Sequence, residues 1–220
     1  MKIKILYEDP NILAIEKPAG ILVHSDNRSK DKTIFDLFLK KYPKVEVVHR
    51  LDRETSGVML LAKNKKAHEF LKKQFMGRTV KKIYNTIVSG HVKNDRGVIN
   101  KPIGRSPKDF RRWLAGRGAR GELREAITEY KVLTRFTEGK EKFSYLEVRP
   151  KTGRTHQIRV HLKFLNHPVA CDTLYNPDKP CPKGLKRLAL HAKSIEFKDL
   201  KSKIVKIESA LPKEFKKHTK

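Results

Sequence analysis

The sequence has 220 residues, which suits one domain, at most one with an elaborated insert, and is long enough for a packed core. Its 51 Lys and Arg residues outnumber 24 Asp and Glu residues, and the resulting net charge of +27 predicts a polyanionic partner. Attraction to a membrane surface is the competing interpretation, but the chain has neither an apolar run of about 18 residues nor a Lys-rich amphipathic helix with an aromatic face. We therefore prefer nucleic acid as the partner.

The amino-terminal segment predicts a pair of strands in a cytoplasmic protein. Residues 3–6 and 12–15 are short β-rich runs separated by the turn-forming sequence Glu-Asp-Pro-Asn. These turn residues interrupt the chain before the apolar region of a signal peptide forms, so we expect the protein in the cytoplasm. The turn Lys17-Pro18-Ala19-Gly20 then ends the second strand. Two roles fit Lys17 equally: a residue that lines a cleft, or an exposed structural lysine.

A charged nonapeptide, HRLDRETSG at His49 to Gly57, lies between the apolar runs 45–48 and 58–62. The two runs predict buried strands, so the nonapeptide is expected to be a loop. Asp52 is at its centre, and the Thr-Ser-Gly that follows supplies turn chemistry. This pattern is typical of a loop that presents one carboxylate. A surface loop with a solvated ion pair is the alternative that the residues alone leave open.

Helices are predicted on both sides of this nonapeptide. The first begins at Thr33 and ends near Pro43. The second is capped by Asn64, and its apolar positions at i, i+3, i+4 and i+8 are expected in the core. These core positions are Ala67, Phe70, Leu71 and Phe75. A strand with alternating character follows at residues 81–89 and carries Tyr84.

Residues 105–124 form the least globular segment because they are rich in Arg and Gly. We expect a flexible loop that becomes ordered on RNA, since Arg binds phosphate with two hydrogen bonds and stacks on bases. Arg111, Arg112 and Arg117 belong to this loop. Trp113 fits an RNA contact and an anchor to the core equally well.

The remaining elements alternate between strands and one helix. Residues 126–136 and 143–148 predict two strands paired across a turn, and Thr155 begins a helix with an apolar stripe. Late strands are expected at residues 187–197 and 204–207, and the tail from Lys213 is expected to be frayed.

The cysteine and histidine spacing predicts no metal site. Cys171 and Cys181 are the only cysteines, and in a basic intracellular chain they are expected to be free thiols and not a disulfide. No pair has the spacing of zinc ligands. His156 and His161 are about 140° apart around a helix, so they cannot bind one ion together. We therefore expect neither a metal nor another cofactor.

Five blocks of the sequence resemble the RluA-type pseudouridine synthases, in the order of that family. The blocks are YEDPNILAIEKPAGILVH at 7–24, HRLDRETSG at 49–57, KKIYNTIVSG at 81–90, RPKTGRTHQIRVHL at 149–162 and RLALHAKSIEF at 187–197. Together they span nearly the whole chain. Five ordered blocks are far more specific than the nonapeptide alone.

The resemblance implies an α+β fold: a single domain over residues 1–220, with a long mixed, mainly antiparallel sheet divided by a catalytic cleft and flanked by helices. It implies an isomerase that converts uridine in ribosomal or transfer RNA to pseudouridine by base flipping, without a cofactor. The accessory RNA-binding domain that many relatives carry at the amino terminus is not expected, because the first block begins at Tyr7. The large positive charge favours a monomer.

The resemblance also assigns the catalytic residues. Asp52 matches the catalytic aspartate, Arg159 the arginine that pairs with it, and Tyr84 the tyrosine that lies against the target base. An aspartate that is desolvated beside a flipped base tends to become neutral, and a guanidinium that stays charged opposes this. A helix arginine on phosphate and a half-buried packing tyrosine are the alternatives. Asp52 can attack the sugar, attack the base or deprotonate the sugar, and the sequence does not separate these roles.

Further residues are expected at the RNA. Arg50 resembles the family side chain that enters the RNA helix as the uridine leaves it. His49 and Thr55 are expected at the same place, where they shape the loop through hydrogen bonds without taking part in the chemistry. The other expected RNA-binding residues are Arg154, His156, Arg111 and Arg112.

One departure from the family pattern affects a turn. After His167-Pro168 the family usually has a Gly-Asp pair, whereas here Cys171 precedes Asp172. Two other functions remain open from the sequence. One is a non-catalytic basic protein for RNA binding or ribosome assembly, and the other is excision of uracil from nucleic acid.

Overall fold

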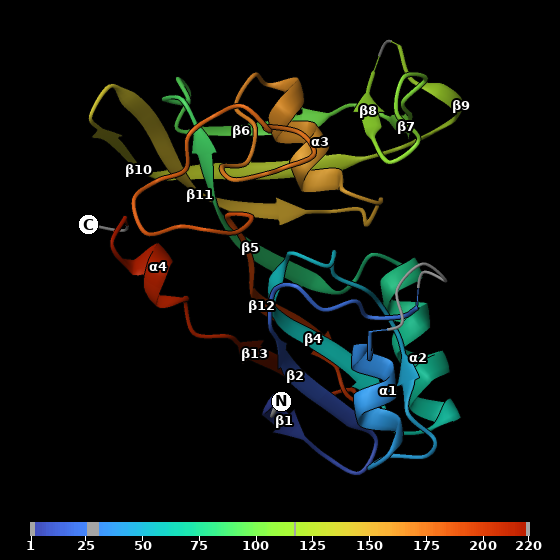
Figure 1. Cartoon of the computed structure of the whole chain (residues 1–220). Helices are drawn as coiled ribbons and strands as arrows, with labels where there is room; N and C mark the ends of the chain where they lie inside the picture. Colours follow the sequence, from blue (N-terminus) through green and yellow to red (C-terminus); the bar gives the residue numbers. More distant parts are fainter. Residues whose placement is uncertain (1–2, 26–30, 117, 219–220) are drawn as a thin grey trace. The chain divides into compact units, whose positions relative to one another are not determined.

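The computed structural model describes residues 3–25, 31–116 and 118–218; Arg117 of the predicted Arg-rich loop lies outside them. The chain forms two compact units, which are described in turn. The first unit comprises residues 1–82 and 191–210, and the second comprises residues 83–190 and 211–220 (Figure 1). Both combine strands with few helices, so the expected α+β class is confirmed. Within the described ranges, no helix is both long and apolar enough to span a bilayer.

The first unit is built on a mixed sheet. Its strands are β1 (Lys4–Glu8), β2 (Ile12–Lys17), β3 (Glu46–Val47), β4 (Ser56–Ala62), β12 (Leu190–Lys198) and β13 (Ile204–Glu208). Neighbouring strands are antiparallel except β4 and β12, which pair in parallel. The predicted hairpin of β1 and β2 is confirmed, and the Asp9 carboxylate closes its turn by accepting from the Asn11 and Ile12 amides at 2.7 and 2.6 Å. Every residue of β4 is buried, as a central strand requires.

Two helices accompany this sheet, and both begin where the sequence predicts. Helix α1 (Ile34–Leu39) has a capping box between Thr33 and Asp36, in which each side chain accepts from the backbone of the other residue. Helix α2 (Lys65–Met76) is capped by Asn64, whose side chain accepts from the Ala67 amide at 2.9 Å. Each cap satisfies amides that have no partner within the helix.

The second unit is built on an antiparallel sheet in the order β5, β11, β10, β6. The strands are β5 (Lys81–Ser89), β6 (Arg96–Asn100), β10 (Ile127–Glu138) and β11 (Glu141–Pro150). The predicted hairpin of β10 and β11 is confirmed, with a bulge between Val132 and Thr134. Helix α3 (Gln157–Phe164) contributes Ile158 and Leu162 to the core of this unit. The helix therefore begins two residues later than Thr155, the expected start.

The Arg-rich segment is not wholly a flexible loop, and this expectation was wrong. It contains a three-stranded antiparallel sheet of β7 (Ile103–Arg105), β8 (Trp113–Ala115) and β9 (Arg120–Arg124). A small apolar cluster that includes Ile103 and Val160 anchors the sheet, and Trp113 packs against this cluster. The Arg105 guanidinium lies 4.4 Å from the Trp113 ring centroid. Strands of three to five residues with many Arg and Gly residues do not show the alternation that predicts a strand.

The carboxyl-terminal tail is also more ordered than expected. Residues Lys213–Lys216 form helix α4. Its Phe215 is fully buried in the core of the second unit. Glu214 accepts a hydrogen bond from Arg187 Nε at 2.9 Å. A buried aromatic side chain and a hydrogen-bonded ion pair therefore dock a short segment that has little helical propensity of its own.

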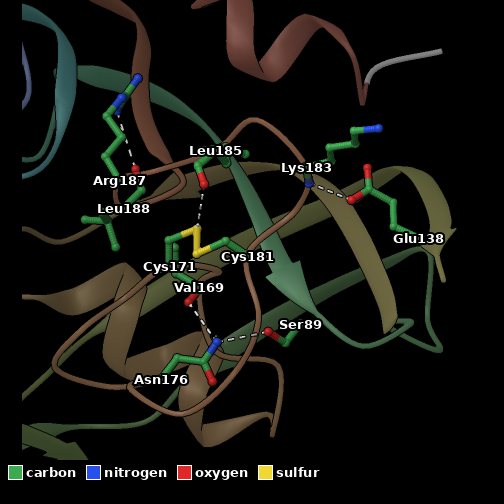
Figure 2. The surroundings of a disulfide bond; sticks show 10 residues. All are labelled: Ser89, Glu138, Val169, Cys171, Asn176, Cys181, Lys183, Leu185, Arg187 and Leu188. Atoms are coloured by element: carbon green, nitrogen blue, oxygen red, sulfur yellow. Dashed lines mark hydrogen bonds between the residues drawn. A yellow bond between two sulfur atoms is a disulfide. The ribbon is translucent and has the colours of Figure 1, made fainter. Parts of the chain in front are cut away.

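The two cysteines form a disulfide, which contradicts the expected free thiols (Figure 2). The Cys171 and Cys181 Cα atoms are 5.2 Å apart, within the range of about 4.4–6.8 Å that a disulfide requires. The expectation rested on compartment and residue count, which say nothing of how the intervening loop folds back. A crosslink that closes a loop of this size stabilises a fold by about 3 kcal/mol in the chain-entropy model.

Replacing Phe215 tests the docking of α4. We expect Phe215→Ala to lower the free energy of unfolding by about 3 kcal/mol, because it leaves a cavity where a buried ring was. The matched control is Lys217→Ala at an exposed position, with an expected change within about 0.5 kcal/mol. Urea titration measures both changes, and equal effects would show that the tail does not contribute to the core.

Candidate active site

Asp52 lies in the loop between β3 and β4 of the first unit. Its side chain is half-buried, whereas the neighbouring Leu51 is 4% exposed and anchors the loop. The Asp52 carbonyl accepts from the Thr55 amide at 3.1 Å, which closes a turn directly after the carboxylate. Arg50 and Arg53 on either side are exposed. The loop thus has an apolar anchor and a tight turn around one acidic side chain.

Lys17 supports this loop from within the protein. Its side chain is fully buried, so the exposed alternative for this residue was wrong. The ammonium group donates to the carbonyl oxygens of Pro18, Arg53 and Thr55, each at 2.9 Å. An ammonium has three donors, and these three acceptors match them. A buried charge is tolerated only when it is hydrogen-bonded, so Lys17 and the carbonyls around Asp52 require one another.

A second set of contacts joins the same two segments. The Gly20 amide donates to the Arg53 carbonyl at 2.9 Å, and Arg53 Nε donates back to the Gly20 carbonyl at 3.0 Å. The turn that ends β2 and the loop that carries Asp52 are therefore joined by one backbone–backbone hydrogen bond and one hydrogen bond from the Arg53 side chain. Two bonds between the same pair of residues restrict this junction more than either bond alone.

The carboxyl-terminal end of the loop is held at β12. Gly57 has φ +117°, and a Cβ atom at this position would overlap the backbone of Ala192. Only glycine allows this conformation and this close approach. Next to it, Ser56 Oγ and His191 Nδ1 are 2.9 Å apart and both side chains are buried. The loop therefore leaves Asp52 and enters a sheet position that no other residue type fits.

His49 supports the loop from its other side. Its Nε2 accepts from the Leu60 amide at 3.0 Å, and its ring stacks on Phe75 with centroids 4.7 Å apart. Burial lowers its pKa to about 3, with a further contribution from the positive charge of Lys82, so the imidazole is neutral at physiological pH. Burial also lowers the pKa of Lys82 to about 8. Two of the residues predicted at the RNA thus have hydrogen bonds that shape the loop. They are His49, through the Leu60 amide, and the buried Thr55, through the Asp52 carbonyl.

Arg159 of the second unit is held by Asp172. The guanidinium Nε and Nη2 donate to the two carboxylate oxygens of Asp172 at 2.7 and 2.8 Å. Arg159 is 8% exposed and Asp172 is 1% exposed. The Tyr175 ring lies beside the guanidinium at 5.0 Å. This two-point pairing fixes the plane of the guanidinium and leaves its other nitrogen, Nη1, outside the Asp172 pair.

The sequence analysis did not identify Asp172 as a partner of Arg159. The two residues are 13 positions apart, on a helix and in a loop. The sequence offered one signal, because Asp172 matches the aspartate of the Gly-Asp pair that the family usually has after His167-Pro168. That match predicts the backbone of a turn and does not predict a partner for the carboxylate. A pairing between a helix and an irregular loop has no sequence period, so spacing cannot reveal it.

The other predicted residues of the second unit lie on β5 and in the connection between β11 and α3. Tyr84 is half-buried on β5, opposite Val148 of β11, and packs against the core. His156 precedes α3 with φ +55°, and its Nδ1 is 3.0 Å from the Tyr175 hydroxyl. Arg154 Nε donates to the Glu125 carbonyl at 2.9 Å.

Arg111 and Arg112 lie in the turn between β7 and β8, where both pair with Asp109. Arg111 Nη2 is 2.9 Å from the Asp109 carboxylate, and Arg112 Nε is 3.4 Å from it. Hydrogen bonds from Arg111 lower the pKa of Asp109 to about 2. Both arginines are thus held at the surface by a carboxylate, which an RNA phosphate resembles in charge and geometry.

A family model described as RNA pseudouridylate synthase matches residues 11–164. An RNA pseudouridine synthase of Aquifex aeolicus is 42% identical over 182 residues, which cover 79% of this chain. Ribosomal large subunit pseudouridine synthase D of Neisseria meningitidis serogroup B is 38% identical over 96% of this chain. Among solved structures, human RNA pseudouridylate synthase domain containing 1 has a TM-score of 0.81 and 27% identity, over 96% of this chain and 84% of that protein.

The chain corresponds to part of the longer relatives. The aligned region spans 56% of the Aquifex protein and 59% of the Neisseria protein. The RNA pseudouridine synthase YhcT of Bacillus subtilis is 36% identical over 98% of this chain, and the aligned region spans 70% of that relative.

Replacing Lys17 tests its support of the loop. We expect Lys17→Met, which keeps the length of the side chain, to lower the free energy of unfolding by about 3 kcal/mol because buried carbonyls lose a charged donor. The control is Lys66→Met at an exposed position on α2, with little expected change. Trypsin cleavage after Arg50 and Arg53 should also be faster in Lys17→Met. Unchanged cleavage and stability would contradict the supporting role.

The lowered pKa of His49 predicts a dependence of stability on pH. The unfolded chain binds a proton at His49 below pH 6.5, whereas the folded chain does so only near pH 3. The contribution is therefore fully present above pH 6.5 and is lost as the pH falls toward 3. From about pH 7 to about pH 5, we expect the wild type to lose about 2 kcal/mol more than His49→Gln, measured by urea titration. Parallel losses in both proteins would contradict an imidazole that stays neutral in the folded protein.

Proposed function

Because the chain belongs to the RNA pseudouridylate synthase family, we propose that it isomerises specific uridines in ribosomal or transfer RNA to pseudouridine. The observation that carries the proposal is the supported loop that presents Asp52. Lys17, Gly20 and Gly57 hold its backbone, as the site geometry describes. A loop built in this way costs little reorganisation when a substrate binds.

The proposed chemistry uses one carboxylate. The bond between ribose and a uracil nitrogen breaks, the detached base turns, and the sugar is joined to a ring carbon. The overall reaction neither oxidises nor hydrolyses the nucleotide, so the chain's own residues must position the base and stabilise charge. In this proposal Asp52 acts on the sugar or on the base, by nucleophilic attack or by deprotonation of the sugar.

Arg159 and Tyr84 have distinct proposed roles at the same uridine. A carboxylate beside a flipped base is desolvated, and a nearby guanidinium keeps it ionised. The pairing of Arg159 with Asp172 supports this role because it fixes the orientation of a buried cation before substrate binds. Tyr84 is proposed to stack on the uracil, an interaction worth about 1–3 kcal/mol.

The remaining proposed contacts involve the RNA around the target. Arg50 is exposed beside Asp52 and is proposed to fill the space that the everted uridine leaves. Arg111 and Arg112 are proposed to exchange Asp109 for RNA phosphate, and Arg154 and His156 to bind the strand near α3. The net charge of +27 supports such sequence-independent contacts. We further propose that the protein acts as a monomer in the cytoplasm, with both units serving one catalytic function.

Tritium release tests the proposed reaction. RNA labelled with tritium at carbon 5 of uridine loses the label when the sugar is joined to that carbon. We expect the wild type to release tritium from bulk cellular RNA and Asp52→Asn to release at least about a thousandfold less, because the essential carboxylate is lost. The control is Glu54→Gln, an exposed carboxylate two residues away whose replacement should leave the rate within about twofold.

Other outcomes identify the competing functions. RNA binding by both proteins without tritium release would favour a non-catalytic RNA-binding or ribosome-assembly protein. Free uracil in the products, separated by chromatography, would indicate excision. Sequencing of pseudouridine sites in RNA treated with the wild type distinguishes ribosomal from transfer RNA targets.

A further inference from the structure

The disulfide closes the loop that holds Arg159. Asp172, the partner of Arg159, directly follows Cys171, and the bridge joins this end of the loop to Cys181. The chain from residue 177 to residue 189 contains no helix or strand. A covalent tether is therefore placed next to the carboxylate that orients the guanidinium, in a segment without regular backbone pairing.

The beginning of this loop is organised around the Asp172 carboxylate. Its Oδ1 accepts from the Leu174 and Tyr175 amides, both at 3.0 Å, in addition to Arg159 Nη2 at 2.8 Å. The Asp172 carbonyl accepts from the Asn176 amide at 2.7 Å. Any displacement of Cys171 thus moves a backbone turn and the carboxylate together, and Arg159 follows because both oxygens of Asp172 bind it.

The rest of the loop is anchored by side chains and has little regular backbone pairing, and Leu185 and Leu188 are buried in the core of the second unit. The Asn176 side chain donates to Ser89 Oγ at 2.9 Å and to the Val169 carbonyl at 3.3 Å (Figure 2). Beyond the bridge, the Lys183 amide donates to Glu138 at 2.6 Å. Between these anchors the disulfide is the covalent constraint, and a disulfide acts mainly by limiting the alternatives open to the chain it closes.

The backbone at Cys171 makes this tether more consequential. Cys171 has φ +58°, a left-handed conformation that a residue with a Cβ adopts at a cost of about 1 kcal/mol. Glycine adopts it freely. Without the bridge, the backbone at Cys171 relaxes toward a more favourable conformation. Asp172 is the next residue, so the turn that carries its carboxylate moves with this change.

We propose that the Cys171–Cys181 disulfide is a positioning element for Arg159. Uridine isomerisation is then fast when the cysteines are bridged and slow when they are thiols. This inference rests on the proposed function, because the rate in question is that of uridine isomerisation. In the proposed cytoplasmic location thiols are normally kept reduced, and disulfides there are usually transient or regulatory. Cys181 is exposed and therefore accessible to thiols.

The redox step is ordinary thiol–disulfide exchange. The thiolate of one cysteine attacks a low-molecular-weight disulfide such as oxidised glutathione and releases one glutathione thiolate. The second cysteine thiolate then attacks the mixed disulfide and releases the other. The protein loses two electrons and two protons, and oxidised glutathione becomes two glutathione thiols.

The test compares bridged and reduced protein on the same RNA. Wild type is incubated with oxidised glutathione or with a phosphine reductant, and mass spectrometry after alkylation counts the thiols. With RNA labelled at carbon 5, we expect reduction to lower the rate at saturating RNA about tenfold and to leave the half-saturating RNA concentration within about twofold, because a displaced positioning group affects the chemical step more than binding.

Two variants provide matched controls. Cys181→Ser cannot form the bridge, so it should be slow and insensitive to oxidant and reductant. Cys171→Gly also lacks the bridge but places the residue type that φ +58° favours, so it separates the effect of the backbone from that of the tether. A slow Cys171→Gly supports the tether as the positioning element. A Cys171→Gly as fast as bridged wild type overturns it.

The single tryptophan gives a readout independent of activity. The Trp113 amide donates to the Tyr175 hydroxyl at 2.9 Å, so its environment reports on the loop. We expect its fluorescence emission to shift on reduction of wild type and to be constant in Cys181→Ser. Lower stability with unchanged emission and unchanged rate of the folded protein would mean a merely structural bridge and would overturn the proposal.

The two proposals fail separately. If bridged wild type releases no tritium from any RNA, the proposed function fails, and the emission of Trp113 still decides whether the bridge positions the loop. If bridged and reduced wild type are equally fast, isomerisation stands and the positioning role of the disulfide is wrong.

Discussion

The candidate site depends on the hydrogen bonds that the buried ammonium group of Lys17 donates to backbone carbonyl oxygens. This ammonium group draws three carbonyl oxygens together, two of them from the loop that carries Asp52. Without a cation at this point, the three carbonyl oxygens would lose the donor that they share, and the Thr55 carbonyl would lose a buried hydrogen bond. The loop can therefore adopt its shape only while the charge is in place, which links the end of β2 to the presentation of a carboxylate 35 residues later.

The second unit has the corresponding arrangement with the charges reversed, because a buried anion there is surrounded by hydrogen-bond donors. The carboxylate of Asp172 gathers donors from its own backbone and from the guanidinium of Arg159. In each unit a buried ionic group forms hydrogen bonds to several neighbouring groups. Because hydrogen bonds are directional, these neighbours have one favourable arrangement. Such sites are preorganised: their geometry is set during folding, and substrate binding has less to rearrange.

The sequence predicts those parts of the fold that depend on neighbours in the chain. The caps at Thr33 and Asn64, the hairpin of β10 and β11 and the apolar strand β4 all follow from local patterns. Of the candidate site, the sequence identifies the Asp52 loop as a unit but not what supports it. The burial of Lys17 and the partner of Arg159 depend on residues far apart in sequence, and no periodicity encodes them. The short strands β7, β8 and β9 are missed for a related reason, because an apolar cluster holds them and their own composition does not favour strands.

The glycine at position 57 restricts the length of the Asp52 loop as well as its composition. Gly57 meets the backbone of Ala192, and β4 is buried on both faces from Ser56 onward. One added residue after Asp52 has no room to bulge at this junction, and sliding β4 by one position would turn its side chains to the opposite faces of the sheet. A change in loop length would instead shift the carboxylate by about 3.3 Å, more than the tolerance of a catalytic group. The junction at Gly57 thus fixes the number of residues between the acid and the glycine as well as the residue type at position 57.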